Sequence, residues 1–363
     1  MTRDYSQFFP SAASSRVPPP KASALTALGW GPFFAQQITV DALETTPPVR
    51  VVAVHRSGLQ VQGDDIDQMI PPGPEATVGD WLCLDWAHPT RSQVLHRKSL
   101  LKRRAPGTDR RVQLIAANID TVFVTTSCNA DFNLARLERY VALALEAEIT
   151  PVIVLTKADL AEDIAPYLAQ LSGLAHLAQA VALDARGAAA RMALAPWCKP
   201  GQSVAFLGSS GVGKSTLTNA LLGKDDVATQ GIREDDAKGR HTTTARHLHF
   251  VPGGCLVLDT PGMRELQLTD AAAGLADVFA DLEDLARACR FGDCQHSSEP
   301  GCAVLAALEA GDIDAARLRR WRKLQAEEAF NAASLAERRS KDKAFGKHVR
   351  AITKGKDKRK WDR

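Results

Sequence analysis

The stretch GSSGVGKST, residues 208–216, decides the fold class of the central part of this chain. It follows the apolar run SVAFL and leads into KSTLTNALLG, which predicts a strand, a glycine-rich turn and a helix in that order. In that context the pattern forms a phosphate-binding loop, because glycine lets the backbone wrap closely around a phosphate and the helix N-terminus attracts its charge. The residues predicted to bind the nucleotide here are Gly208, Ser209, Ser210, Gly211, Val212, Gly213, Lys214, Ser215 and Thr216.

Three further features support this interpretation over a chance glycine-rich turn. Lys214 is placed to reach the β- and γ-phosphates, and the Ser215 hydroxyl is placed to bind Mg²⁺. Downstream, DTPG ends another apolar run: a carboxylate at Asp259 suits the Mg²⁺ shell through a water, and the Gly262 amide could contact the γ-phosphate. Between them, GRHTTTARH suits a switch loop in which Thr243, favoured over Thr242, binds Mg²⁺.

Upstream, TKAD at residues 156–159 follows the apolar run PVIVL and is typical of a guanine-reading element. Guanine presents donors at N1 and at its 2-amino group, and Asp159 can accept from both, whereas adenine would leave that carboxylate unpaired. The stem of Lys157 can lie along the purine face, and Thr156 stands where the usual motif has Asn. The alternative is a strand-end turn that caps the next helix. The later stretch VALDARG, around residues 182–187, could contact the guanine O6, without a residue assigned.

The order of these motifs is unusual, because the base-reading element precedes the phosphate loop. Strands alternate with helices from residue 109 to 265, which predicts a doubly wound α/β sheet. The sequence therefore predicts a multidomain protein whose α/β P-loop GTPase domain, residues 109–265, is circularly permuted.

Regions of different composition flank this domain. Residues 1–47 are rich in Pro, Ser and Ala and are expected to be poorly ordered, with a short helix near residues 24–29. Residues 48–108 show short alternating segments, which predict a small all-β OB-type barrel that binds RNA. Its basic exit, HRKSLLKRR, is expected to contact phosphates unless it is only a solvated face. The basic residues are Arg97, Lys98, Lys102, Arg103 and Arg104.

The C-terminal part is predicted to be a helical zinc-binding domain, residues 266–335, followed by a basic tail, residues 336–363. Within it, CRFGDCQHSSEPGC brings three thiols and one imidazole into fourteen residues. That donor set suits a closed, structural, tetrahedral Zn²⁺ site; reduced thiols in a helical region are the alternative. The predicted ligands are Cys289, Cys294, His296 and Cys302. The other four cysteines fall in apolar segments and are expected in the core.

Composition limits the remaining possibilities. The 363 residues carry a formal net charge of only +3, and no apolar run is long enough to span a bilayer. The first residues lack the architecture of a signal peptide. A soluble, cytoplasmic protein that has no membrane contact and acts as a monomer is expected.

The permuted order, the β-rich segment and the Cys/His cluster together resemble the ribosome small-subunit-dependent GTPases of bacteria, a ribosome-biogenesis family. The resemblance covers about residues 45–330 and is carried by TKAD, GSSGVGKST, GRHTTT, DTPGMRE and the cysteine cluster. It implies an OB-fold, a permuted GTPase domain and a zinc domain. It also implies slow GTP hydrolysis with Mg²⁺, stimulated by the 30S subunit during late maturation, and contact with 16S rRNA. The proline-rich start and VALDARG depart from the family pattern.

The sequence does not show which group orients the water that attacks the γ-phosphate. Met263 stands where small GTPases carry the Gln that orients the attacking water, so another group or a partner must do so. His241 is the best local candidate, with Lys214 and Thr243 as the other predicted catalytic residues; a solvated loop residue or a ribosome contact is the alternative for His241. Two other functions remain open: a GTP-gated RNA-binding switch whose hydrolysis is incidental, and an ATP-using enzyme such as a kinase, against which Asp159 argues.

Overall fold

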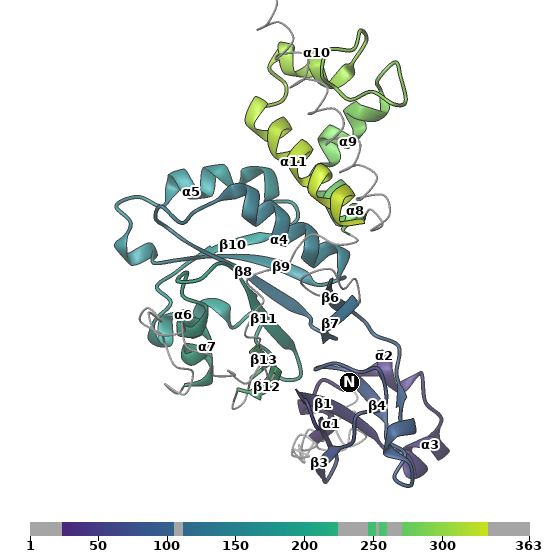
Figure 1. The fold of residues 1–363 in the computed structure, drawn as a ribbon. Helices are drawn as coiled ribbons and strands as arrows, with labels where there is room; N and C mark the ends of the chain where they lie inside the picture. The colour runs from purple at the N-terminus through teal and green to yellow at the C-terminus, as the bar shows by residue number, and fades with distance from the viewer. Residues whose placement is uncertain (1–23, 105–111, 224–245, 252–253, 260–270, 333–363) are drawn as a thin grey trace, which may run out of the picture.

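The structure is a computed structural model, and it describes residues 24–104, 112–223, 246–251, 254–259 and 271–332 (Figure 1). Three groups of elements follow one another along the chain: β-strands with short helices, an α/β unit, and four C-terminal helices. The α/β unit carries the phosphate loop and lies between the other two groups in Figure 1.

The α/β unit is built on parallel strands, as the alternating pattern predicts. Four neighbouring pairs run parallel, in the order β10-β9-β8-β11-β13, and β12 pairs antiparallel with β13 at the end. The strands are β8 (Thr121–Ser127), β9 (Thr150–Thr156), β10 (Gln179–Ala182), β11 (Ser203–Leu207), β12 (Arg246–Phe250) and β13 (Leu256–Asp259). The base-reading strand β9 and the phosphate-loop strand β11 both pair with β8, so one strand separates them.

Helices cover both faces of this sheet. Side chains on both faces of the strands are therefore buried, and they are mostly apolar. Along β9, Val152 and Val154 belong to the core shared with α6 and α7, whereas Ile153 and Leu155 belong to the core shared with α4. Figure 1 shows α4 and α5 on one side and α6 and α7 on the other. The helices are α4 (Leu134–Glu146), α5 (Ala165–Gln170), α6 (Gly187–Leu194) and α7 (Lys214–Leu222).

Helix α4 begins with a side-chain cap. Asn133 has extended backbone angles, and its side chain accepts a hydrogen bond from the Arg136 amide at 3.0 Å. Asn133 is therefore the N-cap of α4, and it satisfies one of the free amides of the first turn.

The N-terminal strands are short and antiparallel. Strand β1 pairs with β2 and β4, β2 with β3, and β4 with β5. They are β1 (Pro48–His55), β2 (Gly58–Gly63), β3 (Ile66–Ile70), β4 (Trp81–Cys83) and β5 (Gln93–Val94), with a 3₁₀ turn, η2 (Pro89–Arg91), before β5. One cluster of buried apolar side chains lies between them: Val49, Val51, Leu59, Val61, Ile70, Leu82 and Leu84.

Within residues 24–47 the short helix expected near residues 24–29 is present, and the expectation of poor order does not hold for the rest. These residues form three short helices, α1 (Ala24–Ala27), α2 (Pro32–Ala35) and α3 (Val40–Thr45). Trp30 and Phe34 pack on Trp81 of β4, with ring centroids 4.8 and 5.7 Å apart. The Pro- and Ser-rich composition belongs to residues 1–23, whereas residues 24–47 contain no serine and bury large aromatic rings. Residues 1–23 lie outside the described residues.

The β-rich part is joined to the α/β unit by strand pairing. Strand β1 pairs with β12, with Ala53 opposite His247, so the parallel sheet continues into β1, β2 and β3. Strands β6 (Leu100–Arg104) and β7 (Val112–Ala117) form a second, two-stranded sheet that connects the two parts in sequence.

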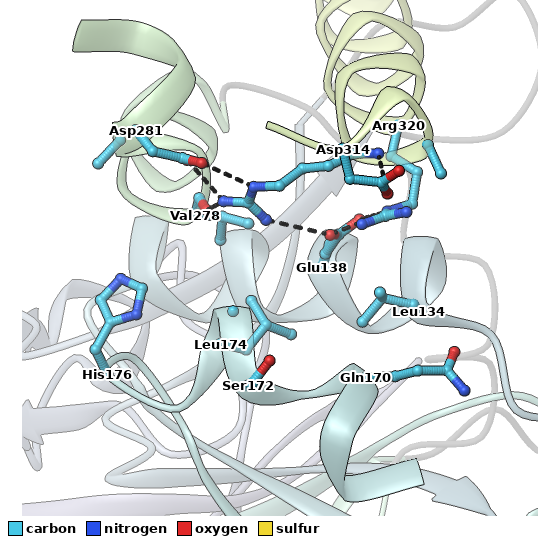
Figure 2. A pocket seen from close by; sticks show the side chains of 14 residues that line it. Leu134, Glu138, Gln170, Ser172, Leu174, His176, Val278, Asp281, Asp314 and Arg320 are labelled. Carbon is cyan, nitrogen blue, oxygen red and sulfur yellow. Dashed lines mark hydrogen bonds and ion pairs between the residues drawn. The ribbon is translucent and has the colours of Figure 1, made fainter. Parts of the chain in front are cut away.

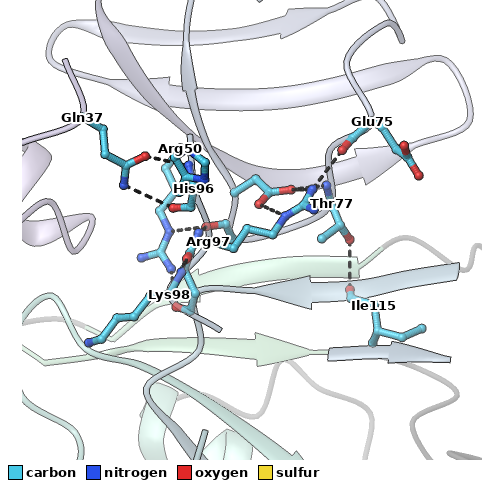
Figure 3. Close-up of polar contacts among 11 residues, drawn as sticks. Gln37, Arg50, Glu75, Thr77, His96, Arg97, Lys98 and Ile115 are labelled. Carbon is cyan, nitrogen blue, oxygen red and sulfur yellow. Dashed lines mark hydrogen bonds and ion pairs between the residues drawn. The ribbon is translucent and has the colours of Figure 1, made fainter. Parts of the chain in front are cut away.

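The buried side chain of Arg50 connects the β-rich part to the α/β unit by hydrogen bonds (Figure 3). Its guanidinium donates to the Asn118 carbonyl at 3.0 Å, to the Ser203 hydroxyl at 2.8 Å and to the Leu28 carbonyl. Burial lowers the pKa of Arg50 to about 10, and nearby aspartates oppose that shift. Its Nε also donates to the Gly79 carbonyl at 3.3 Å, so the buried charge is tolerated because its donors are satisfied by four separate segments.

The C-terminal helices are α8 (Ala272–Val278), α9 (Ala280–Arg287), α10 (Ala303–Ala310) and α11 (Ala315–Ala332). Helix α8 packs on α4, and Arg320 of α11 donates to the buried carboxylate of Glu138 at 2.8 Å. A cavity of about 710 Å³ lies at this contact, between α4, the 3₁₀ turn η4 (Ser172–Leu174) and α11 (Figure 2). None of the residues predicted to bind the nucleotide lines this cavity. In the described part of the chain no helix is long and apolar enough to cross a membrane.

Candidate nucleotide site and metal cluster

The phosphate loop has the backbone that its glycines predict. Gly208 has φ +153°, and a Cβ there would lie 2.3 Å from the Thr125 carbonyl oxygen. Only glycine fits at that point. Gly213, at φ +92°, is the N-cap of α7 and has no side chain to block an anion approaching the helix N-terminus.

The two predicted reactive side chains of the loop stand at the start of α7. The Lys214 ammonium donates to the Gly208 carbonyl at 2.8 Å and to the Ser209 carbonyl, so it lies over the mouth of the loop. Ser215 follows in the first turn and is exposed. The phosphate role of Lys214 and the Mg²⁺ role of Ser215 stay predictions.

Thr156 joins the base-reading element to the phosphate loop. Its buried hydroxyl lies 2.7 Å from the Val212 carbonyl oxygen and 3.0 Å from the Thr126 carbonyl oxygen, with both as acceptors. A hydroxyl has one proton to donate, so the two carbonyls share it. Residues 56 positions apart in sequence are thus held together at the site. The short hydroxyl of Thr156 reaches the loop from the position where an Asn is usual.

The remaining base-reading residues follow in a tight turn. Lys157 has a left-handed backbone, φ +56°, and caps the 3₁₀ turn η3 (Ala158–Leu160) that carries Asp159. The Asp159 carboxylate is partly exposed and accepts a hydrogen bond from the Arg186 guanidinium, Nη2 to Oδ2, at 2.6 Å. Arg186 belongs to VALDARG, for which the sequence suggested a contact with the base but no residue.

Asp184 is a second residue that sequence reasoning did not assign. Its carboxylate accepts from Arg186 Nε at 2.9 Å and from the Arg186 amide at 3.0 Å. These hydrogen bonds, chiefly the one from the side chain, lower the pKa of Asp184. The sequence signal was the spacing Asp-x-Arg just after a predicted strand, which is too common to assign a role.

Several predicted residues lie outside the described residues: His241, Thr242, Thr243, Gly262 and Met263. Asp259 is placed by its backbone at the end of β13, where its register partner on β12 is His247. That position is at the carboxyl end of a strand, the edge at which ligands of open α/β sheets bind.

The four predicted zinc ligands meet at one point. The ligand atoms of Cys289, Cys294, His296 and Cys302 all lie within 4.8 Å of one another. Cys289 Sγ is 3.8 Å from Cys302 Sγ, and each of these sulfurs is 3.5 Å from His296 Nδ1. A tetrahedral Zn²⁺ with bonds of about 2.3 Å to sulfur requires sulfur atoms about 3.8 Å apart. The cluster can hold one such ion, with Nδ1 as the imidazole ligand.

Neighbouring groups hold the cluster in this shape. The Glu299 carboxylate accepts from the amides of Gln295, Ser297 and Ser298, and these backbone hydrogen bonds lower the pKa of Glu299 to about 2. The His296 ring packs on Trp321 at 5.5 Å. Burial, then the Arg322 charge, lowers the pKa of His296, which favours the neutral imidazole that binds metals.

The two basic residues just before β6, Arg97 and Lys98, differ in how available they are for contact with RNA. Arg97 makes a two-point contact with the buried Asp80, at 2.8 and 3.0 Å, and also donates to the Glu75 carbonyl (Figure 3). Lys98 pairs with Asp120 at 2.9 Å and stays exposed. The expected contact of Arg97 with a phosphate is therefore not supported. If Arg97 left Asp80 to bind a phosphate, the Asp80 charge would stay buried and unpaired.

With the site described, the relatives can be compared. A family model described as RsgA GTPase matches residues 94–269. The chain is 50% identical over 339 residues to "Small ribosomal subunit biogenesis GTPase RsgA 2" of Vibrio vulnificus, covering 93% of this chain and 97% of that protein. This chain belongs to the RsgA GTPase family. It is a GTP hydrolase, and the circularly permuted order read from its motifs is that of the family.

Other comparisons agree with RsgA membership. "Small ribosomal subunit biogenesis GTPase RsgA" of Mesorhizobium japonicum is 50% identical over 316 residues, 85% of this chain and 91% of that protein. The crystal structure of YjeQ from Thermotoga maritima matches with a TM-score of 0.55 and 28% identity, over 76% of this chain and 96% of that one. A structure titled YloQ, a circularly permuted GTPase, shares the fold at 20% identity, TM-score 0.53, over 80% and 97%.

A second family model, ABC transporter, matches residues 194–359. That range includes the phosphate loop, which the nucleotide-binding parts of both families have in common. The RsgA relatives extend over most of the chain, and they decide the family.

Proposed function

We propose that this chain binds the small ribosomal subunit and acts late in its maturation, hydrolysing GTP to GDP and phosphate with turnover that the subunit stimulates. The observation that carries the proposal is the Thr156 hydrogen bond to Val212, which joins base reading and phosphate binding in one site. The names of the relatives, small ribosomal subunit biogenesis GTPases, supply the process.

The nucleotide contacts follow from the positions of the side chains. Asp159 reads guanine, the Lys157 stem covers one face of the base, and Lys214 neutralises the β- and γ-phosphates. Ser215 binds the Mg²⁺ that accompanies GTP. For the residues outside the described ranges, the sequence proposals are kept: Thr243 on Mg²⁺, Gly262 on the γ-phosphate and His241 on the attacking water.

The domain roles complete the proposal. The five antiparallel strands around one core suit an OB-type barrel, residues 48–108, that contacts 16S rRNA. The permuted GTPase domain spans 109–265, the helical domain with one structural Zn²⁺ spans 266–335, and a basic tail follows. The chain is proposed to act as a monomer.

The test is hydrolysis of GTP and of ATP by the full chain, with and without purified 30S subunits. Subunits are expected to raise GTP turnover by at least about tenfold, ATP turnover is expected to stay at background, and Lys214→Ala is expected to abolish the stimulated rate. GTP turnover that subunits do not change would overturn the proposed function. Nucleotide-dependent subunit binding without such stimulation would instead support the GTP-gated switch.

A further inference from the structure

Arg186 stands at the guanine subsite although no nucleotide role is assigned to it. It follows β10 in the loop that leads into α6, and it contacts Asp159, which lies 27 residues earlier. The same loop lies against the phosphate loop, because a Cβ on Gly213 would be 3.6 Å from the Ala185 Cβ. The loop of residues 184–186 therefore touches both halves of the nucleotide site.

The guanidinium of Arg186 is held at a fixed angle. Asp184 accepts from both its Nε, at 2.9 Å, and its Nη2, at 3.0 Å, and two parallel contacts of this kind orient the planar group. Nη2 is the nitrogen that also donates to Asp159 Oδ2. Asp184 thus fixes Arg186, and Arg186 in turn fixes one oxygen of Asp159.

This contact is compatible with a bound guanine. An ionised carboxylate has about four acceptor positions, two on each oxygen. Oδ2 can keep the Arg186 hydrogen bond and still accept from the base, while Oδ1 accepts the second base donor. A carboxylate must hold its plane to accept both guanine donors at once, and an exposed side chain on a short turn does not do so unaided.

We propose that Arg186, anchored by Asp184, is a positioning residue that sets the plane of the Asp159 carboxylate for guanine recognition. The inference rests on the proposed nucleotide site and deepens it. Arg186 acts through Asp159, so its removal affects the part of the affinity that depends on the 2-amino group of guanine. Inosine keeps the N1 donor and lacks the 2-amino group, so it isolates that part.

The experiment measures the affinities of GDP and inosine diphosphate for the full chain, with Arg186→Ala, Asp159→Asn and the double variant. Arg186→Ala is expected to weaken GDP binding about fivefold, the upper range for an exposed ion pair, and to narrow the GDP-to-inosine preference by a similar factor. In the Asp159→Asn background, Arg186→Ala is expected to change GDP affinity less than about twofold, since its target charge is gone.

The matched control is Arg287→Ala, which removes an exposed ion pair with Asp284 at 2.7 Å in the helical domain and is expected to leave both affinities unchanged. Arg186→Gln repeats the test if the alanine variant does not fold. Unchanged GDP affinity in both Arg186 variants, or an equal loss with and without Asp159, overturns the inference. A wild-type chain that binds no GDP would instead overturn the proposed nucleotide site.

Discussion

The nucleotide site and the Cys/His cluster are assembled in opposite ways. The proposed nucleotide site collects residues 156, 184–186 and 208–216, and these stand on buried parallel strands that place them without a ligand. The cluster takes its four ligands from residues 289–302, and none of residues 290–301 is buried. A site built on a sheet keeps its shape when one contact is lost, whereas a site built in an exposed loop depends on its metal.

The permuted order of the motifs does not keep them apart in the folded chain. Strands β9 and β11 both flank β8, so the two motifs meet in the folded chain although the TKAD segment precedes the phosphate loop in the sequence. A permutation inside the cluster would separate ligands that only their short loop brings together.

The largest expected effect is loss of the metal from the cluster. Cys302→Ser removes one thiolate ligand while its hydroxyl can still accept from the Leu305 amide, and structural Zn²⁺ contributes on the order of 10 kcal/mol to small modules. Zinc content is expected to fall to background, and amide exchange over residues 289–310 is expected to become fast. GDP affinity is expected to change less than about twofold. A variant of the buried Cys128, Cys128→Ala, is the control that should keep its zinc.

If the zinc-depleted chain lost nucleotide binding as well, the two sites would form one cooperative unit, and the contrast between them would be wrong. Chelation of the wild-type chain, followed by GDP titration, measures this without a substitution.

The next effect is on chemistry at the phosphate loop. Lys214→Ala removes the ammonium that meets the β- and γ-phosphates, and loss of one charge-stabilising donor costs about 10²–10³ in rate. Single-turnover GTP hydrolysis is expected to fall by that factor. Thermal unfolding is expected to stay within a few degrees of wild type, because the sheet rather than the lysine holds the loop. A large fall in melting temperature would contradict a preformed site.

A smaller effect is expected at the contact between the two motifs. Thr156→Val keeps the shape of the side chain but leaves the buried Val212 carbonyl without its donor, at a cost of about 2 kcal/mol. GDP affinity is expected to fall by about 10- to 30-fold. Thr156→Ser, which keeps the hydroxyl, is expected to bind within about threefold of wild type. Equal losses in the two variants would show that the methyl group matters instead.

The smallest effect is expected from an ordinary helix cap in the same domain. Asn133→Ala removes the cap of α4 and is expected to lower the free energy of unfolding by about 1 kcal/mol, measured by urea denaturation. Zinc content and GDP affinity are expected to stay unchanged. A change in either one would show that α4 transmits strain to the sites.

The sequence predicted the permuted α/β GTPase fold and the four Cys/His residues that the structure brings together. The phosphate loop and the four zinc ligands are local patterns, so their spacing carries the geometry. Contacts between distant segments were not predictable in the same way: the contact of Arg186 with Asp159 arises only because β10 and β9 are neighbours. The order of residues 30–47 was not predicted because Trp30 and Phe34 are stabilised by Trp81, far along the chain.

Arg97 illustrates the same limit for charge. Its place in a basic run suggests an RNA contact, yet its partner Asp80 lies 17 residues earlier and is buried. A charge run shows that basic residues are present and does not show which of them are already paired.

The most direct test of the account is the base preference of the isolated chain. Equilibrium titration should show GDP bound at least about 100-fold more tightly than ADP, because adenine leaves the Asp159 carboxylate unpaired. Asp159→Asn should lose most of that preference and bind xanthosine diphosphate instead, since an amide can donate to the 2-oxo group of xanthine. Equal affinities for GDP and ADP in the wild type, or an unchanged preference in Asp159→Asn, would contradict a guanine site built from TKAD and the phosphate loop.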